Sequence, residues 1–85
     1  MDIGVEARIK QILHKRIGMS VEAITSEAKL VDDLGVDSLD FVELVIATEE
    51  AFGVSISEEL FSEVKTVRDV AELVEHLARE QVAAG

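Results

Sequence analysis

The sequence predicts an all-α fold, a small four-helix bundle with three long helices, one short third helix and a long ordered loop between helices one and two. Three observations support this fold. Apolar residues recur at the spacing of a helix face in three segments of the chain. Capping residues or glycine stand where these helices should begin or end. The 85 residues contain no repeat and no linker-like stretch, so we expect 1–85 to be one domain with a frayed tail at 81–85.

The first and last helices have the clearest patterns. Between Val5 and Ile17, apolar positions follow the stripe of an amphipathic helix, and Gly18 stands where that helix should end. Thr66 and Asp69 form a capping-box pattern at the start of the last helix. The apolar stripe of the last helix consists of Val67, Val70, Ala71, Val74, Leu77 and Ala78. Each of these helices should therefore bury one face.

The segment 38–52 predicts a central helix that is packed on several sides. Its broad apolar arc consists of Leu39, Phe41, Val42, Leu44, Val45, Ile46 and Phe52. At about 100° per residue, the remaining arc holds Ala47 and three acids, which we call the acidic strip: Asp40, Glu43 and Glu50. We expect the acidic strip to be the only solvent-facing part of this helix. Glu49 falls on the opposite side, where we expect a structural role such as an ion pair with a base of the first helix.

Residues 19–37 form a long connection between the first and central helices. Such connections are uncommon in small domains. This one carries apolar residues that can attach it to the bundle, namely Val21, Ile24, Leu30, Val31 and Leu34. We therefore expect an ordered crossover that contains short turns. After Gly53, a short third helix of one or two turns is expected over about 57–64.

The net charge of −10 is concentrated in one part of the chain. Between Leu30 and Val64 there are ten acids and no lysine or arginine, whereas the rest of the chain carries eight acids and eight bases. Such a charge repels phosphate backbones and anionic membranes, so we expect basic protein surfaces as partners and no nucleic acid. No segment is typical of a signal peptide or a membrane span. We expect a soluble, cytoplasmic monomer without membrane insertion.

Ser38 stands at the predicted start of the central helix, inside the acidic region. Either Ser38 or its neighbour Asp37 can be a helix cap, because both residue types satisfy free backbone N–H groups. The same position favours an attached phosphate, since the free N–H groups and the helix dipole stabilise negative charge. From the residues alone, both interpretations of Ser38 stay open.

Two other kinds of site fit the sequence poorly. A catalytic serine needs an oriented base, and the two histidines, His14 and His76, lie late in the first and last helices on polar flanks. Asp32 and Glu43 have the spacing of the first and last ligands of an EF-hand, but apolar residues replace the oxygen ligands between them. We expect neither enzymatic activity nor a specific metal site. Because the chain has no cysteine, thiol chemistry would need an imported thiol.

A longer motif surrounds Ser38. Residues 34–40 read Leu-Gly-Val-Asp-Ser-Leu-Asp, 42–45 read Val-Glu-Leu-Val and 49–52 read Glu-Glu-Ala-Phe. In a small acidic chain, this string resembles the attachment motif and recognition helix of the acyl carrier proteins, and the resemblance covers nearly the whole chain. It implies that Ser38 is esterified by 4′-phosphopantetheine, which makes the chain a phosphoprotein. The terminal thiol of that group holds acyl intermediates of fatty-acid, lipid or related biosynthesis as thioesters.

The resemblance also implies roles for other residues. Asp37 and Leu39 would flank the attachment site for the phosphopantetheinyl transferase. The acidic strip would dock on basic surfaces of acyl-loading and acyl-transferring enzymes. The resemblance places a cleft for the acyl chain between the central and third helices, with Phe41, Val42, Ile46 and Phe61 as candidate linings. These four residues fit an ordinary core equally well, because apolar helical stripes are usually core.

Three features depart from the commonest fatty-acid pattern of the family. Phe41 stands where smaller residues are usual, Ser57 replaces a proline before the third helix, and Leu60 and Phe61 occupy a region that is more often acidic and small. We therefore expect a specialised carrier with a reshaped cleft entrance. A peptidyl, aminoacyl or polyketide carrier of a secondary-metabolite pathway stays open as an alternative. So does a non-carrier acidic helical module in which Ser38 is only a cap.

Overall fold

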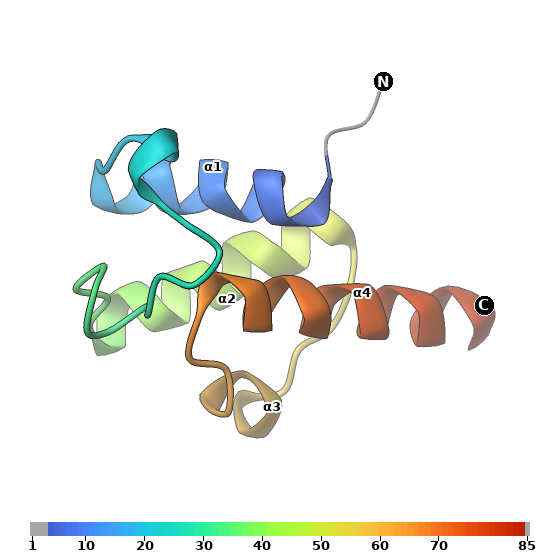
Figure 1. Cartoon of the computed structure of the whole chain (residues 1–85). Coiled ribbons are helices and arrows are strands. Elements are labelled where there is room, and N and C mark those ends of the chain that lie inside the picture. The colour runs from blue at the N-terminus through green and yellow to red at the C-terminus, as the bar shows by residue number, and fades with distance from the viewer. Residues whose placement is uncertain (1–3, 85) are drawn as a thin grey trace.

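The computed structural model describes residues 4–84, and the side chains of 4–80. Within this range the chain is helical and contains no strand, only an isolated bridge between Lys29 and Thr66. The helices in order are α1 (Val5–Ile17), the one-turn 3₁₀ helix η1 (Val21–Ala23), α2 (Ser38–Phe52), α3 (Glu58–Ser62) and α4 (Val67–Ala84). Three long helices form the bundle, and the short α3 lies on the side away from α1 (Figure 1). The predicted fold class is confirmed.

Helices α1 and α4 contribute their predicted stripes to the core. Ile9 and Leu13 of α1 are buried, and α1 packs against both α4 and α2 (Figure 1). The buried residues of the α4 stripe are Val67, Val70, Ala71, Val74 and Leu77. Helix α1 ends at Gly18, whose φ of 81° is a left-handed conformation that glycine adopts readily.

The capping box predicted at the start of α4 is present. The Asp69 N–H donates to Thr66 Oγ1, and the Thr66 N–H donates to Asp69 Oδ2, each over 3.1 Å. The Lys65 N–H donates to the same carboxylate oxygen. These backbone N–H groups, that of Lys65 foremost, hold the pKa of Asp69 below its ordinary value.

The long loop is ordered, as predicted. Its buried apolar residues are Ile24, Ala28, Leu30, Leu34 and Val36. Val31 was also expected to pin the loop, but this prediction is wrong because its side chain is 58% exposed. Backbone hydrogen bonds fasten the loop to the start of α4: Leu30 N–H to Lys65 C=O at 2.8 Å, Val67 N–H to Ala28 C=O at 3.1 Å and Arg68 N–H to Ser26 C=O at 2.9 Å.

Helix α2 has the predicted bounds but a different environment. In α2, all of which the structure describes, only Leu44 and Thr48 are buried. The most exposed apolar residues of α2 are Leu39 at 66%, Val42 at 53% and Ile46 at 49%. The predictions that α2 is packed on several sides, and that the acidic strip is its only exposed part, are therefore wrong. The physical reason is that α3, with five residues, is too short to cover the broad apolar arc.

The segment from Gly53 to α4 holds the remaining predicted features. Ser57 caps α3, because its Oγ accepts a hydrogen bond from the Leu60 N–H over 3.2 Å. Glu49 has a structural role as expected, but its partner is the backbone N–H of Ile56 at 2.7 Å and not a base of α1. In 4–84 no helix is both long and apolar enough to cross a membrane. The side chains of 81–84 and residue 85 lie outside the described residues, so the frayed tail stays a prediction.

Candidate functional site

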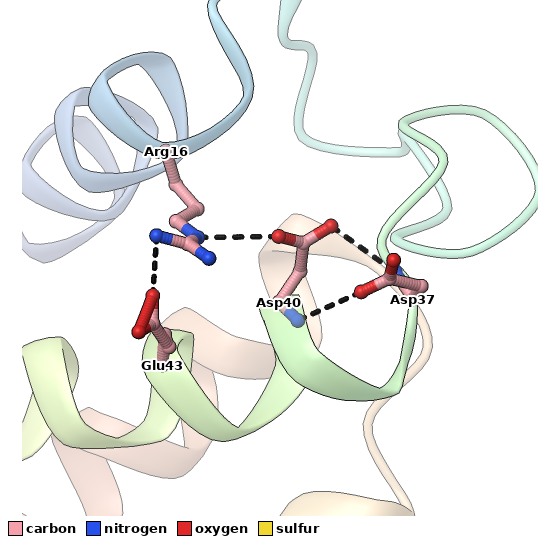
Figure 2. Close-up of polar contacts among 4 residues, drawn as sticks. All are labelled: Arg16, Asp37, Asp40 and Glu43. Carbon is pink, nitrogen blue, oxygen red and sulfur yellow. Dashed lines mark hydrogen bonds and ion pairs between the residues drawn. The ribbon is translucent and has the colours of Figure 1, made fainter.

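The start of α2 is fixed by a reciprocal pair of hydrogen bonds. Asp37 is the N-cap: its Oδ1 accepts from the Asp40 N–H over 2.8 Å, and Asp40 Oδ2 accepts from the Asp37 N–H over 3.4 Å (Figure 2). This capping box satisfies two backbone donors at the helix start without using Ser38. Ser38 is the first residue of the helix and is exposed. Its hydroxyl is therefore not needed as a cap, which settles that alternative in favour of Asp37.

A cavity of about 680 Å³ opens beside Ser38. It lies between α2, α3 and the end of the long loop, and its lining residues are Val31, Val36, Asp37, Ser38, Phe41, Val42, Val45, Ile46, Glu58, Phe61 and Ser62. Phe41 and Phe61 meet edge to face, with ring centroids 5.0 Å apart and an interplanar angle of 83°. The structure thus brings all four predicted lining residues into one cavity.

Part of this lining was not among the residues predicted from the sequence. Val45 lies one turn after Phe41 on the same face of α2, so helical periodicity could have identified it. Val31 and Val36 reach the cavity from the loop, whose path no local pattern indicates. Glu58 and Ser62 add polar groups from α3. The cavity is therefore mainly apolar, with its polar groups contributed by the starts of α2 and α3 and by Ser62.

A base from α1 contacts the acidic strip, although residues 30–64 around the strip contain no lysine or arginine. Arg16, near the end of α1, donates from Nε to Asp40 Oδ1 over 3.1 Å, and its Nη1 pairs with Glu43 (Figure 2). The Asp37 N–H foremost, together with the Arg16 guanidinium, holds the pKa of Asp40 below its ordinary value. The fold thus supplies a cation from 24 residues earlier in the chain.

The acidic strip borders α1 along a second groove of about 610 Å³. The lining residues are Ile12, Lys15, Arg16, Glu43, Leu44, Ile46, Ala47, Glu50 and Ala51. Two acids of the strip therefore share a groove with two bases of α1. Glu43 and Glu50 remain exposed there.

The surroundings of Ser38 fit a group that is joined through a phosphate and carries an apolar cargo. The first turn of a helix favours a phosphate, because its free N–H groups and dipole stabilise negative charge. The adjoining cavity offers an apolar lining beside the same hydroxyl. His14 forms a hydrogen bond with the backbone carbonyl of Met19, and His76 pairs with Glu80. Neither histidine is therefore placed to act as a general base on the Ser38 hydroxyl.

Comparisons with known proteins identify the family of the chain. A family model described as phosphopantetheine attachment site matches residues 7–74. The chain is 44% identical to an acyl carrier protein of Syntrophobacter fumaroxidans over 84 residues, which are 98% of this chain and 100% of that protein. Among solved structures, a Mycobacterium tuberculosis protein provisionally identified as an acyl carrier protein is similar, with a TM-score of 0.80 and 33% identity. That similarity covers 86% of this chain and 97% of the other.

Proposed function

Because the chain belongs to the acyl carrier protein family, whose members are carriers and not enzymes, we propose that Ser38 is the residue that bears its covalent 4′-phosphopantetheine. The observation that carries this proposal is the position of Ser38, exposed on the first turn of α2 and at the edge of the cavity. The capping box of Asp37 and Asp40 holds this turn in place without engaging the Ser38 hydroxyl. When bound, the group supplies the thiol that this chain lacks, on which acyl cargo is held as a thioester.

The cavity is the proposed site for the acyl part of the cargo. An acyl chain gains about 0.8 kcal/mol for each methylene removed from water, and the walls formed by Phe41, Val42, Ile46 and Phe61 are apolar. A partner enzyme then has to draw the acyl chain out of the cavity against this gain. The non-carrier alternative no longer applies, because the family is that of carriers.

The cargo is proposed to be specialised. Phe41 and Phe61 both line the cavity and their rings meet edge to face, so this pair is proposed to shape the space for the cargo. We therefore expect Phe41→Thr to change which acyl donors load the protein, as measured by intact mass after loading with donors of different length. Identical preferences in the parent and the variant would contradict the proposal. The alternative is a peptidyl, aminoacyl or polyketide cargo on the same serine, which loading of the parent by donors of those kinds would indicate.

Partner enzymes are proposed to dock around the same helix. Asp37 and Leu39 flank Ser38 for the phosphopantetheinyl transferase, and Leu39 is available because its side chain is exposed. The acidic strip is proposed to meet basic surfaces of the transferase and of acyl-loading and acyl-transferring enzymes. Opposite charge speeds such encounters, an effect limited by screening to about 8 Å at physiological salt.

Intact mass after incubation with a broad-specificity phosphopantetheinyl transferase and coenzyme A tests the attachment site. We expect one phosphopantetheine adduct on the parent chain and none on Ser38→Ala. Ser20→Ala is the matched control, because Ser20 is exposed in the long loop and makes no side-chain cap bond. The control should be modified like the parent. An adduct that persists in Ser38→Ala, or its absence from the parent, would refute the proposal.

A further inference from the structure

We infer that Arg16 is an internal competitor for the acidic strip: in the free protein its guanidinium occupies the place at Asp40 and Glu43 that a partner's cation takes on docking. The inference rests on the proposed docking of the acidic strip on basic partners. It adds a regulatory element from α1, a helix to which the sequence assigned no role in recognition.

The geometry of Arg16 is that of an inserted cation. Asp40 and Glu43 are three residues apart in α2, so their carboxylates project from neighbouring positions on one face. The guanidinium lies between them and contacts one with Nε and the other with Nη1 (Figure 2). A planar guanidinium suits this double contact better than an ammonium group, because its donors form a fixed fork.

Arg16 contacts Asp40 and Glu43 at a position from which a partner's cation can displace it. The side chains of Arg16 and Glu43 are partly exposed, at 37% and 45%. Ion pairs at such positions are weak, since water and salt compete with them. A partner's arginine can therefore replace Arg16 at modest cost, and the released guanidinium returns to solvent. The buried core does not have to open, because neither carboxylate belongs to it.

The consequence concerns which partners the strip accepts. A partner has to compete with a resident guanidinium that satisfies two carboxylates at once. A partner whose arginine reaches the space between Asp40 and Glu43 can contact both carboxylates, whereas isolated lysines match these contacts less well. Arg16 thus lowers the affinity for all basic partners and discriminates against those with dispersed positive charge.

Kinetics of modification by the broad-specificity transferase test the competition. Initial rates are measured against the concentration of the unmodified chain, with coenzyme A saturating. We expect Arg16→Gln to lower KM about twofold to fivefold, the range that exposed ion pairs support, and to leave kcat unchanged. Arg16→Lys keeps the charge but loses the fork, so its KM should lie between those of the parent and Arg16→Gln.

Two controls separate competition from other effects. Arg68→Gln removes one charge and breaks an exposed ion pair with Glu27 in the middle of the long loop, so it reports the effect of net charge alone. We expect its KM to stay close to that of the parent. In the double variant Asp40→Asn with Glu43→Gln, adding Arg16→Gln should change nothing, because the contested carboxylates are gone.

The outcomes distinguish this inference from the proposals beneath it. If folded Arg16→Gln has an unchanged or higher KM while the double variant raises KM, the strip docks but Arg16 does not compete, and the inference is overturned. If the double variant leaves KM unchanged, the docking proposal fails and the inference with it. If Arg16 were only a tie between α1 and α2, Arg16→Gln would lower the melting temperature without lowering KM. Arg16→Lys, which retains the charge, supplies the same comparison if Arg16→Gln does not fold.

Discussion

Helix α2 presents a charged side to α1 and an apolar side to α3, and the two sides are completed in different ways. On the charged side, Arg16 reaches across from α1 and pairs with Asp40 and Glu43. On the apolar side, the described part of the chain provides no comparable cover, so a cavity remains beside Ser38 and Val42 stays about half exposed. Ile46 lies where the two sides meet, since it lines both the cavity and the groove along α1.

The difference shows how one helix can serve two kinds of ligand. Charged groups can be satisfied by a single long side chain that is easily exchanged, which suits reversible contact with a partner. An apolar face is removed from water only when other apolar groups cover it, and the five residues of α3 cover little of it. A mobile apolar cargo can therefore complete the apolar side, while Asp40 and Glu43 on the charged side already have a partner in the free protein.

The largest expected effect is on the apolar side, where Phe61 joins α3 to the core. Its side chain is buried, and its ring meets that of Phe41. Removing a buried phenyl ring typically costs about 3–5 kcal/mol, a large part of the stability of a small domain. We expect Phe61→Ala to lower the free energy of unfolding by about that amount, as measured by urea denaturation.

Leu60→Ala is the control for Phe61→Ala, since it is the preceding residue of the same helix and its side chain is 41% exposed. Its change should stay within about 0.5 kcal/mol, as is usual for surface positions. Equal losses in the two variants would mean that α3 is not anchored by Phe61. The apolar side of α2 would then be bounded by a different part of the molecule.

The two sides of α2 also differ in how far the sequence predicts them. Local patterns identified the bounds of α2 and the capping box of α4, because both depend on residues close together in the chain. The pattern Asp37-x-x-Asp40 resembles Thr66-x-x-Asp69, so the capping box of α2 was open to the same inference. Local patterns could not predict the partner of the acidic strip, because Arg16 precedes Asp40 by 24 residues and only the packing of α1 on α2 brings them together.

The cavity was predicted in part for the same reason. Phe41, Val42 and Ile46 share a face that helical periodicity defines. Whether such a face is core or cavity depends on the volume that covers it, which no local pattern encodes. The apolar arc suggested a helix packed on several sides, and the shortness of α3 made part of it a cavity wall instead.

An intermediate effect is expected at the start of α2, which the two sides share. Asp37→Ala removes the acceptor for the Asp40 N–H and breaks the capping box. Losing an N-cap costs typically about 1 kcal/mol, so the midpoint of urea unfolding should fall accordingly. Asp37→Asn keeps a side-chain oxygen at the same place and should retain most of the stability. If the two variants unfold alike, the charge of Asp37 matters and not its acceptor geometry.

The smallest expected effect is a pH dependence of the charged side. The Asp37 N–H and Arg16 hold the pKa of Asp40 below its ordinary value of 3.8. The folded chain therefore binds a proton at Asp40 less readily than the unfolded chain does. The resulting stabilisation is complete above the ordinary value and is lost as the pH falls through the lower pKa of the folded state.

The difference in unfolding free energy between the parent and Asp40→Asn isolates this stabilisation, because protonation of the many unpaired acids changes both proteins alike. The difference should be constant between about pH 5 and pH 6 and shrink below about pH 4, where the Asp40 carboxylate of the unfolded chain becomes protonated.

Asp69→Asn should behave in the same way, since backbone N–H groups lower the pKa of Asp69 in a similar capping box. Adding Arg16→Gln should weaken the pH dependence at Asp40 and leave that at Asp69 unchanged. The difference in unfolding free energy between the parent and Asp40→Asn could instead grow as the pH falls. The contacts of Asp40 drawn in Figure 2 would then not hold its carboxylate in the charged form.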